Sequence, residues 1–428
     1  MLEEYYNKDT KTLFLRHYFN YLLYNLPKDV KIIIFLENIN EQIFSNFNQQ
    51  VDNLPASLTH LTFGYNFNQH VDNLPVSLTH LTFGNNFNKS VDKLPVNLSH
   101  LTFGWCFNKP VNYLPINLTH LTFGIDFNKS VDKLPANLTH LTLGWYFNQS
   151  VNLLPVNLLN LIFVGKFNQS VDYLPVNLTD LTFGHNFNQS VDNLPVNLTH
   201  LTFGYTYPII KDEAYYQLLY QSYQCLQFVK NYSCNFNKSV DNLPINLTHL
   251  ILGDLFNQSV DNLPINLTHL TFGWYFNQSV DKLPENLISL KFNGEHNKAI
   301  NKLPLKLIKL KTAKKFNYPA SKLPETITHF SFFENYKYKN EIPIHIEYLT
   351  ILFSSCYYTK YYNDGVCDPK VDYGERIENL HYNVKHIKIN KYKLYSLKKV
   401  PFGCKIIAHK TKEQIYKEID YRKEFYSD

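Results

Sequence analysis

Histidine recurs at one place in a repeated pattern, and it is the residue of this chain with the widest chemical repertoire. Five consecutive members are spaced twenty residues apart, and the whole set comprises His60, His80, His100, His120, His140, His200, His249, His269 and His329. A row of neutral imidazoles could chelate a transition metal. The five consecutive histidines have no Cys or carboxylate in their column. We therefore favour a polar strand face of stacked rings, and we predict no metal and no cofactor.

Aspartate forms a second column with possible chemistry. Its members are Asp52, Asp72, Asp92, Asp132, Asp172, Asp192, Asp241, Asp261 and Asp281. A row of carboxylates could bind calcium. Asparagine takes the same place at Asn112, Asn152 and Asn301, and it keeps the hydrogen bond of an aspartate without the charge. We therefore expect each of these side chains to accept a backbone N–H in a turn.

Asparagine occupies one further position in thirteen units, from Asn48 to Asn317. The consecutive members include Asn68, Asn88, Asn108, Asn128 and Asn148. A side-chain amide has both donors and acceptors, so it can bond the backbone of its own unit and of the next. We expect this column to be a structural ladder and not a binding site.

Two residues that vary from unit to unit follow the glycine of each repeat. Aromatic residues at this pair of positions include Tyr65, Trp105, Trp145, Tyr146, Trp274 and Tyr275. Trp and Tyr are enriched at binding hot spots, so this rim and the five consecutive histidines are the candidate partner-binding residues. The alternative is that the rings only pad the turn.

Motifs of catalysis are missing from the sequence. We find no phosphate-cradling glycine loop, no nucleophile elbow and no metalloprotease helix. Catalysis needs one irregular cluster of converging groups, whereas these columns are regular. We therefore predict that the chain is not an enzyme.

The elements that position these columns follow from a unit of twenty residues, seen clearly in 187–206. Residues 60–64 alternate apolar and polar side chains, which predicts a short strand with Leu61 and Phe63 turned inward and His60 outward. We expect Gly64 to supply a positive φ at the turn. Pro55 lacks an N–H and belongs on the return side of the coil. One unit cannot bury enough surface alone, so the units must stack.

The predicted fold is a repeat solenoid, mainly β. We expect an LRR-like right-handed coil of 20-residue repeats with a parallel concave sheet and helical end caps. Residues 1–46 form an N-terminal helical cap and a degenerate first repeat, and 47–204 form regular repeats. A helical insert follows at 205–235, repeats continue over 236–332, and 333–428 hold degenerate repeats and a basic C-terminal cap. Helical spacing in 1–24 and in 411–428 suggests the two caps.

Charge and composition bear on the compartment and the partners. The net charge is +5, but residues 291–428 hold 26 Lys and Arg against 15 Asp and Glu. This basic third could meet nucleic acid or an anionic surface, or it is a solvated cap. The six cysteines show no zinc spacing, no apolar run could span a membrane, and many N-x-S/T triplets would be glycosylated on secretion. We expect a cytoplasmic protein, in the host cytoplasm if the chain is viral.

The unit FNQSVDNLPVNLTHLTFG keeps Phe-Asn, Leu-Pro and L-x-x-L-x-F-G in fixed register. It resembles the FNIP repeat, known from social amoebae and the giant viruses of amoebae, which is regarded as a relative of leucine-rich repeats. The family proline after Phe-Asn is kept at Pro110, whereas Ser stands there in most units. Many members carry an N-terminal F-box, so the resemblance also implies a link to a ubiquitin ligase. Residues 1–25 are too few for the helices of an F-box.

The function predicted from these observations is a non-catalytic protein–protein interaction scaffold. Its partner, whose identity the sequence does not give, would bind the concave face or the aromatic rim. One alternative is a substrate-recognition adaptor of a ubiquitin ligase. The other is a binder of nucleic acid or an anionic surface through the basic C-terminal third.

Overall fold

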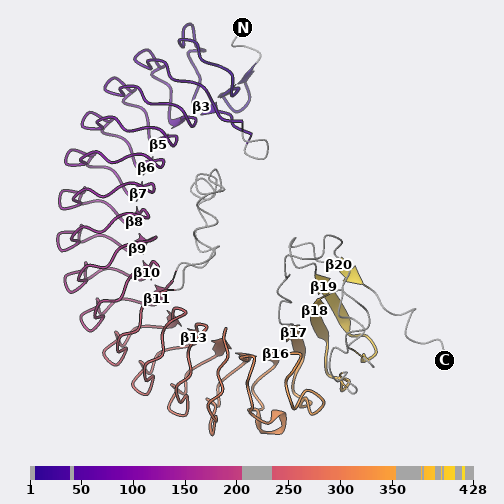
Figure 1. The fold of residues 1–428 in the computed structure, drawn as a ribbon. Helices are drawn as coiled ribbons and strands as arrows, with labels where there is room; N and C mark the ends of the chain where they lie inside the picture. Colours follow the sequence, from indigo (N-terminus) through magenta and orange to yellow (C-terminus); the bar gives the residue numbers. More distant parts are fainter. Residues whose placement is uncertain are drawn as a thin grey trace, which may run out of the picture. The chain divides into compact units, whose positions relative to one another are not determined.

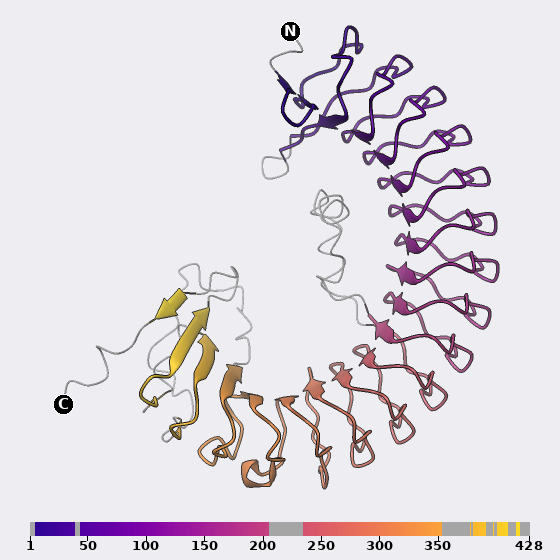
Figure 2. The ribbon, with the colours of Figure 1, turned by 180° about the vertical axis from the view of Figure 1, so that it is seen from behind.

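The chain forms two compact units, Met1–Leu247 and Thr248–Asp428, drawn from opposite sides in Figures 1 and 2. The computed structural model describes residues 5–38, 43–204, 234–352, 377, 380–390, 397, 400–409 and 417–419. Each unit is a stack of coils, and nearly every coil adds one short strand to a parallel sheet (Figure 1). The prediction of an LRR-like β-solenoid with repeats of about twenty residues is therefore confirmed.

The strands of the N-terminal unit keep the register of the sequence repeat. His60 lies opposite His80, and Leu61 lies opposite Leu81, so like residues stack from coil to coil. All neighbours from β2 to β11 pair in parallel, and β1 pairs with β2 in the antiparallel sense. The strands are β1 (Tyr6–Asn7), β2 (Thr12–Leu15), β3 (Ile32–Phe35), β4 (His60–Thr62), β5 (His80–Thr82), β6 (His100–Thr102), β7 (His120–Thr122), β8 (His140–Leu143), β9 (Asn160–Phe163), β10 (Asp180–Phe183) and β11 (His200–Phe203).

The C-terminal unit continues the same construction with longer strands toward its end. Its strands from β12 to β19 pair in parallel, and β20 pairs with β19 in the antiparallel sense. The elements are β12 (His249–Ile251), β13 (His269–Phe272), β14 (Ser289–Phe292), β15 (Lys309–Lys311), the 3₁₀ turn η2 (Ala320–Lys322), β16 (His329–Phe333), β17 (Tyr348–Leu352), β18 (His386–Asn390), β19 (Lys405–His409) and β20 (Lys417–Ile419).

The core is built from columns of identical side chains. Leu61 and Phe63 are buried, as the alternation of the strand predicts. Phe63 stacks on Phe67 of the same coil with ring centroids 3.6 Å apart, and Phe67 stacks on Phe87 of the next coil at 6.1 Å. Aromatic stacking adds to the gain from burying these large rings. Each coil therefore has a dry centre that it shares with both neighbours.

The Leu-Pro segment lies on the return side of the coil, where no sheet forms. The N–H of Leu58 donates to the carbonyl of Pro55 at 3.0 Å, and the same turn recurs in the following coils. Proline is tolerated here because this segment needs no ladder donor at that position. Twenty residues are thus enough for a strand, two turns and a short return.

The glycine column is explained by close approach of neighbouring backbones and not by a positive φ. Among the described residues, the glycines with a positive φ are Gly204 and Gly403, so the conformation expected of Gly64 is wrong. A Cβ added to Gly84 or Gly124 would overlap the backbone carbonyl of the glycine one coil earlier. At Gly84 and Gly124 glycine is therefore needed because a side chain has no room beside the neighbouring coil.

The N-terminal cap is made of strands, so the helix predicted within 1–24 is wrong. β1 and β2 form a hairpin, and β2 pairs in parallel with β3. Leu13 and Leu15 of β2 are buried at a spacing of two, which is the period of a strand. An exposed sheet edge gains more from another paired strand than from a helix laid beside it, because the edge N–H and C=O groups need partners.

Other predicted helices fall mostly outside the described residues. Of the helical insert predicted at 205–235, residues 205–233 lie outside the described residues, and Cys234 and Asn235 belong to the following coil of the array. Of the predicted helix at 411–428, residues 417–419 are strand β20, so that part of the prediction is wrong. No α-helix occurs in the part of the chain that the structure describes.

The last coils depart from the twenty-residue register. The sequence aligns Ile387 with Ile407, but the structure pairs Ile387 with Ile406, which is nineteen residues away. Ile406 is buried and Ile407 is half-buried. A slip of one residue exchanges the faces of a strand, so the burial of Ile406 fixes this register.

Candidate functional site

Five histidines of the N-terminal unit form one continuous strip on the strand face. We call this set the histidine strip, and its members are His60, His80, His100, His120 and His140. Neighbouring rings stack with centroids 4.2 Å apart and interplanar angles of 10° to 13°. The strand directs these rings away from the buried Leu column, because successive side chains of a strand point to opposite faces.

A hydroxyl on the preceding residue fixes the orientation of each ring. The hydroxyl oxygen of Thr79 lies 2.9 Å from Nδ1 of His80, and Ser99 stands in the same relation to His100. The Thr79 hydroxyl is also 3.1 Å from the carbonyl oxygen of Thr59 in the coil before. Each ring is therefore held by stacking on its neighbours and by the side-chain hydroxyl of the preceding residue, toward which its Nδ1 is turned.

Four rings of the strip, His60, His80, His100 and His140, have lowered pKa values that favour the neutral form at pH 7. Burial and the neighbouring imidazoles together lower the pKa of His100 to about 4. Burial lowers the pKa of His60 and His140, and burial with the adjacent rings lowers that of His80. Adding a second positive charge so close to the first is costly, so the rings cannot all become charged together.

The arrangement does not suit a metal. In parallel stacked rings the lone pairs of equivalent nitrogens run side by side and do not converge on one point, as a coordination sphere requires. No group of three or more His, Cys, Asp or Glu in the described part of the chain could hold a metal ion.

Side-chain amides form a second column that runs through the array. The backbone N–H of Asn68 donates to Oδ1 of Asn48 at 2.9 Å, and that of Asn88 donates to Oδ1 of Asn68 at 3.0 Å. The same bond recurs for the backbone N–H groups of Asn108, Asn128, Asn148, Asn168, Asn188 and Asn237. Each amide therefore joins one coil to the next.

Asn20 begins this ladder, and the sequence reasoning missed it. Its Oδ1 accepts the backbone N–H of Asn48 at 2.9 Å. Phe19 stacks on Phe47 with centroids 6.2 Å apart. The Phe19-Asn20 dipeptide is the signal that could have revealed this coil, but its spacing from Phe47 is longer than the period.

The repeated coils match a known family. The FNIP Repeat model matches residues 47–86, 67–104, 87–126, 127–166, 167–206, 236–273 and 256–282. The chain is an FNIP-repeat protein. The FNIP coils are LRR-like, and families with such repeats are generally non-catalytic.

Solved structures with a similar fold include CroV588, a giant-virus protein described as a novel circular LRR protein. The identity is 34%, the TM-score is 0.69, and the match covers 93% of this chain and 59% of that one. The FNIP chain thus spans about three fifths of the length of that relative. YopM from Yersinia enterocolitica is 17% identical at a TM-score of 0.46, with 91% and 80% of the two chains covered. No curated protein matches the chain.

The aromatic rim of the N-terminal unit comprises Tyr65, Trp105, Trp145 and Tyr146, which are candidate partner-binding residues of the FNIP coils. Tyr65, Trp105 and Trp145 are half-buried, whereas Tyr146 is 44% exposed. The Lys166 ammonium lies 4.4 Å from the centroid of the Tyr146 ring, one coil along. In this coil Trp145 is thus half-buried, whereas Tyr146 faces solvent.

A glycine lets one rim tryptophan reach across a coil. Trp145 lies 5.3 Å from the ring of His185, two coils along, and Gly165 stands between them. A Cβ at Gly165 would overlap the Trp145 side chain. The rim therefore combines aromatic surface with cationic or imidazole neighbours.

The C-terminal unit has an aromatic pair of its own, at the two variable positions that follow the glycine of an FNIP coil. Trp274 is 40% exposed and Tyr275 is 57% exposed. The Lys314 ammonium lies 4.8 Å from the Trp274 ring centroid. A shorter imidazole stack also occurs here, because His249 and His269 lie 4.2 Å apart.

The aspartate column differs from the expected turn. Asp92 accepts the hydroxyl of Ser90, and Asp172 accepts that of Ser170, each at 2.7 Å. Asp172 also accepts the amide of Asn193 in the next coil at 3.1 Å. Its partners are thus a hydroxyl two residues earlier and a neighbouring coil, rather than a backbone N–H of its own turn. The hydrogen bonds from Ser170 and Asn193 lower the pKa of Asp172.

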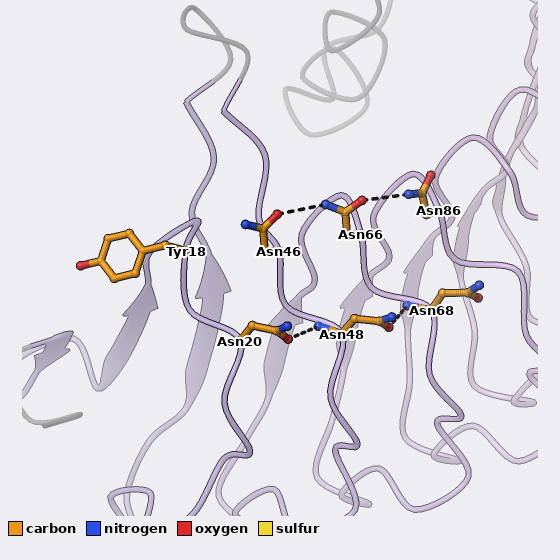
Figure 3. Close-up of a pocket in the computed structure, with 7 residues that line it drawn as sticks. All are labelled: Tyr18, Asn20, Asn46, Asn48, Asn66, Asn68 and Asn86. Atoms are coloured by element: carbon orange, nitrogen blue, oxygen red, sulfur yellow. Dashed lines mark hydrogen bonds between the residues drawn. The ribbon is translucent and has the colours of Figure 1, made fainter.

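A groove of about 800 Å³ lies at the N-terminal end of the FNIP array (Figure 3). Its lining residues are Tyr18, Asn20, Asn46, Asn48, Asn66, Asn68 and Asn86. The sequence reasoning placed Asn66 and Asn86 in the variable pair but gave them no role. Three asparagines at twenty-residue spacing within a variable position are the signal that could have singled them out.

Among the described residues, no helix is long and apolar enough to cross a membrane.

Proposed function

We propose that this chain is a non-catalytic scaffold that binds a protein partner through the histidine strip of its N-terminal unit. An LRR-like scaffold of this kind is typical of repeat proteins that bind other proteins. The supporting observation is the strip itself, five stacked rings on one strand face with their orientation fixed from both sides. In repeat proteins the exposed sheet supplies an extended surface for partners.

The rigidity of the strip favours binding. Ordering of interface side chains costs free energy on association, and rings already stacked at 4.2 Å have little freedom left to lose. The lowered pKa values of His60, His80, His100 and His140 favour neutral rings at pH 7, so a partner does not have to desolvate a row of cations. Flat imidazole rings offer apolar contact, and the threonines two residues later on the same strand face offer hydrogen bonds; these are Thr62, Thr82, Thr102, Thr122 and Thr142.

The aromatic rim supplies a second contact in this proposal. Tyr146 is exposed and carries a lysine over its ring, and Trp145 lies beside it. Exposed Tyr and Trp with cationic neighbours are common at the centres of protein interfaces. A partner of the strip that also extends to the rim would use both features.

The proposal is tested by affinity capture from amoeba cytosol, where we expect the protein to act. The bait is the full-length chain, compared with a triple variant His80→Asn, His100→Asn, His120→Asn. Asparagine occupies the same strand position naturally at Asn160, so the coil geometry should survive. Tyr113→Ala, at a residue 69% exposed outside the strand and the rim, is the matched control.

We expect a specific protein to be retained by the native chain and by the control, and lost with the triple variant. Retention by all three baits would contradict binding at the strip. A variant Tyr146→Ala separates a contribution of the rim from that of the strip. Recovery of a ubiquitin-ligase component with every bait would favour the adaptor function instead.

A basic strand face in the C-terminal unit supports a second candidate function. Lys291 lies opposite Lys311 on neighbouring strands, and Lys309 lies on the same strand as Lys311. Burial and the nearby Lys291 lower the pKa of Lys311. Lysines gathered on one face are typical of phosphate-backbone contacts. Binding to a DNA or RNA duplex that weakens steeply with salt, and that Lys291→Gln with Lys309→Gln reduces, would support it. Salt-independent or absent binding would exclude it.

A further inference from the structure

The groove at the N-terminal end of the array is lined by two parallel rows of side-chain amides. The inner row is the start of the structural ladder, Asn20, Asn48 and Asn68, and the outer row is Asn46, Asn66 and Asn86. Figure 3 shows both rows, with the ring of Tyr18 turned away from them. Six of the seven lining residues are therefore asparagines, and none of the seven carries a charge.

The inner row presents donors to the groove. The group that accepts the backbone N–H of Asn68 at 2.9 Å must be the Oδ1 of Asn48, because Nδ2 has no lone pair to offer. The same argument fixes Oδ1 of Asn20 on the backbone N–H of Asn48. The Nδ2 group of each residue is then directed away from that bond. Its hydrogens recur once per coil at the strand spacing of about 4.8 Å.

The outer row is also oriented by its own bonds. Nδ2 of Asn66 donates to the carbonyl of Ser45 at 3.0 Å, and Nδ2 of Asn86 donates to Oδ1 of Asn66 at 3.0 Å. In the next coil the position is occupied by Cys106. The outer row therefore ends there, and this two-row arrangement is local even though the inner ladder continues.

The chemistry of the groove excludes several ligand classes. A phosphate or sulfate is held by charge-assisted bonds from Arg or Lys, and no lining residue supplies one. An extended peptide repeats its same-side groups every two residues, roughly 6.6–6.8 Å, which does not match coils about 4.8 Å apart. An apolar ligand would cut off from water those amide hydrogen-bonding groups that face the groove, which costs free energy.

We propose that this amide groove binds a neutral, hydroxyl-rich ligand, a glycan chain. Each sugar hydroxyl can both donate and accept, so it can meet the Nδ2 donors of the inner row and the Oδ1 acceptors of the outer row. The amides are held in place before the ligand arrives, which lowers the ordering cost of binding. A volume of about 800 Å³ is in the range of small-molecule sites and holds a few sugar rings.

The proposal is tested on the full-length chain with three neutral probes, cellohexaose, chitohexaose and maltohexaose. Binding is followed through the side-chain amide NMR signals of selectively ¹⁵N-labelled asparagine and by calorimetry. The test variant is Asn66→Leu with Asn86→Leu, which alters the outer row and leaves the ladder of the inner row in place. The matched control is Asn186→Leu, at the same repeat position in a coil outside the groove.

We expect at least one probe to shift the amide signals of Asn46, Asn66 and Asn86 saturably. The double variant should weaken that binding by about tenfold or more, as the loss of two hydrogen-bonding groups predicts, and the control should not. If the double variant does not fold, glycan binding is judged instead from the amide signal shifts of the native chain and from the affinity of the single variant Asn86→Leu.

Three outcomes would overturn the proposal. The first is that no probe shifts the groove signals. The second is that the double variant binds as tightly as the native chain. The third is that heparin binds the groove with a strong salt dependence while the neutral probes do not. The last outcome would assign the groove to an anionic ligand. The glycan groove does not depend on the histidine strip, since the two lie on different parts of the coil.

Discussion

The regular coils of residues 47–204 and the later coils of the C-terminal unit solve the same stacking problem in two ways. The regular coils have strands of three or four residues, and each coil is joined to the next by a hydrogen bond from a backbone N–H to an asparagine side chain. In the C-terminal unit the described amide ladder runs from Asn257 to Asn297, and strands β16–β19 have five residues each.

The difference shows that a coil can be joined to its neighbour by side chains or by backbone. In the regular coils the Phe and Asn columns hold the stack, so a short strand is sufficient. The repeat first loses its consensus where His296 replaces Phe and Ala313 replaces Gly, and the additional backbone ladder bonds appear in the coils after these, in strands β16–β19. Sequence identity between coils therefore decreases where strand length increases.

The strongest test of this comparison alters the glycine column. Gly124→Ala places a Cβ onto the backbone of Gly104 and Trp105, so it should destabilise the N-terminal unit by about 3 kcal/mol through overpacking. Ala313→Gly, at the equivalent place in the C-terminal unit, should cost only about 0.5–1 kcal/mol through added flexibility. Urea unfolding followed by amide hydrogen exchange measures both. Equal effects in the two units would show that coil spacing does not differ between them.

The amide ladder should be next in size. Asn108→Ala removes the acceptor of the Asn128 backbone N–H and should cost about 1–2 kcal/mol. Asn317→Ala, at an exposed residue for which the described residues show no ladder bond, should change stability by less than about 0.5 kcal/mol. The same exchange experiment separates them. A large effect at Asn317 would mean that the ladder continues in the later coils.

Acid should destabilise the N-terminal unit through its histidine strip. The pKa of His100 falls from 6.5 to about 4 on folding, so the unfolded chain binds more protons between these values. The stabilisation is complete above pH 6.5 and is lost as the pH falls toward 4, by on the order of 1 kcal/mol for this half-exposed ring. His100→Asn should flatten this dependence and leave stability at pH 7 nearly unchanged. NMR titration of the ring protons gives the midpoint directly, and an unshifted midpoint for His100 would refute the stacked strip.

The smallest effect expected is at the rim. Lys166→Met removes the cation above Tyr146 and should cost about 0.5 kcal/mol at an exposed site. Lys314→Met tests the same contact with Trp274 in the C-terminal unit. A double-mutant cycle with Tyr146→Leu isolates the ring contact, and zero coupling would show that the lysine only lies near the ring.

The period of the sequence was sufficient to predict the coil, its strand and its core. Leu61 and Phe63 point inward because an alternating strand has only two faces, and one of them must be dry. The N-terminal helix could not be excluded from the sequence, because the apolar residues of 1–24 also fit a period near 3.6. Only the partner strand, Ile32–Phe35, determines that Leu13 and Leu15 pair instead.

Some parts of the candidate site could be predicted from the sequence, and others could not. The histidine column and its stacking follow from spacing alone. The hydroxyl of the preceding residue at each Nδ1 depends on rotamers, which the sequence does not specify. The two-row groove was missed because it needs the inner column and part of a variable position to lie side by side, which depends on the path of the coil between residues 46 and 48.

The bond from each asparagine to the following coil has an evolutionary consequence. Every regular coil offers its successor the same acceptor that it receives from its predecessor, so the junction does not depend on which copy follows. The Asn188 amide even meets Asn237 beyond a long insertion. A gene of this kind can gain or lose whole units by recombination between its own repeats, and the joined coils will still fit. Its length is therefore free to change between lineages while each junction stays the same.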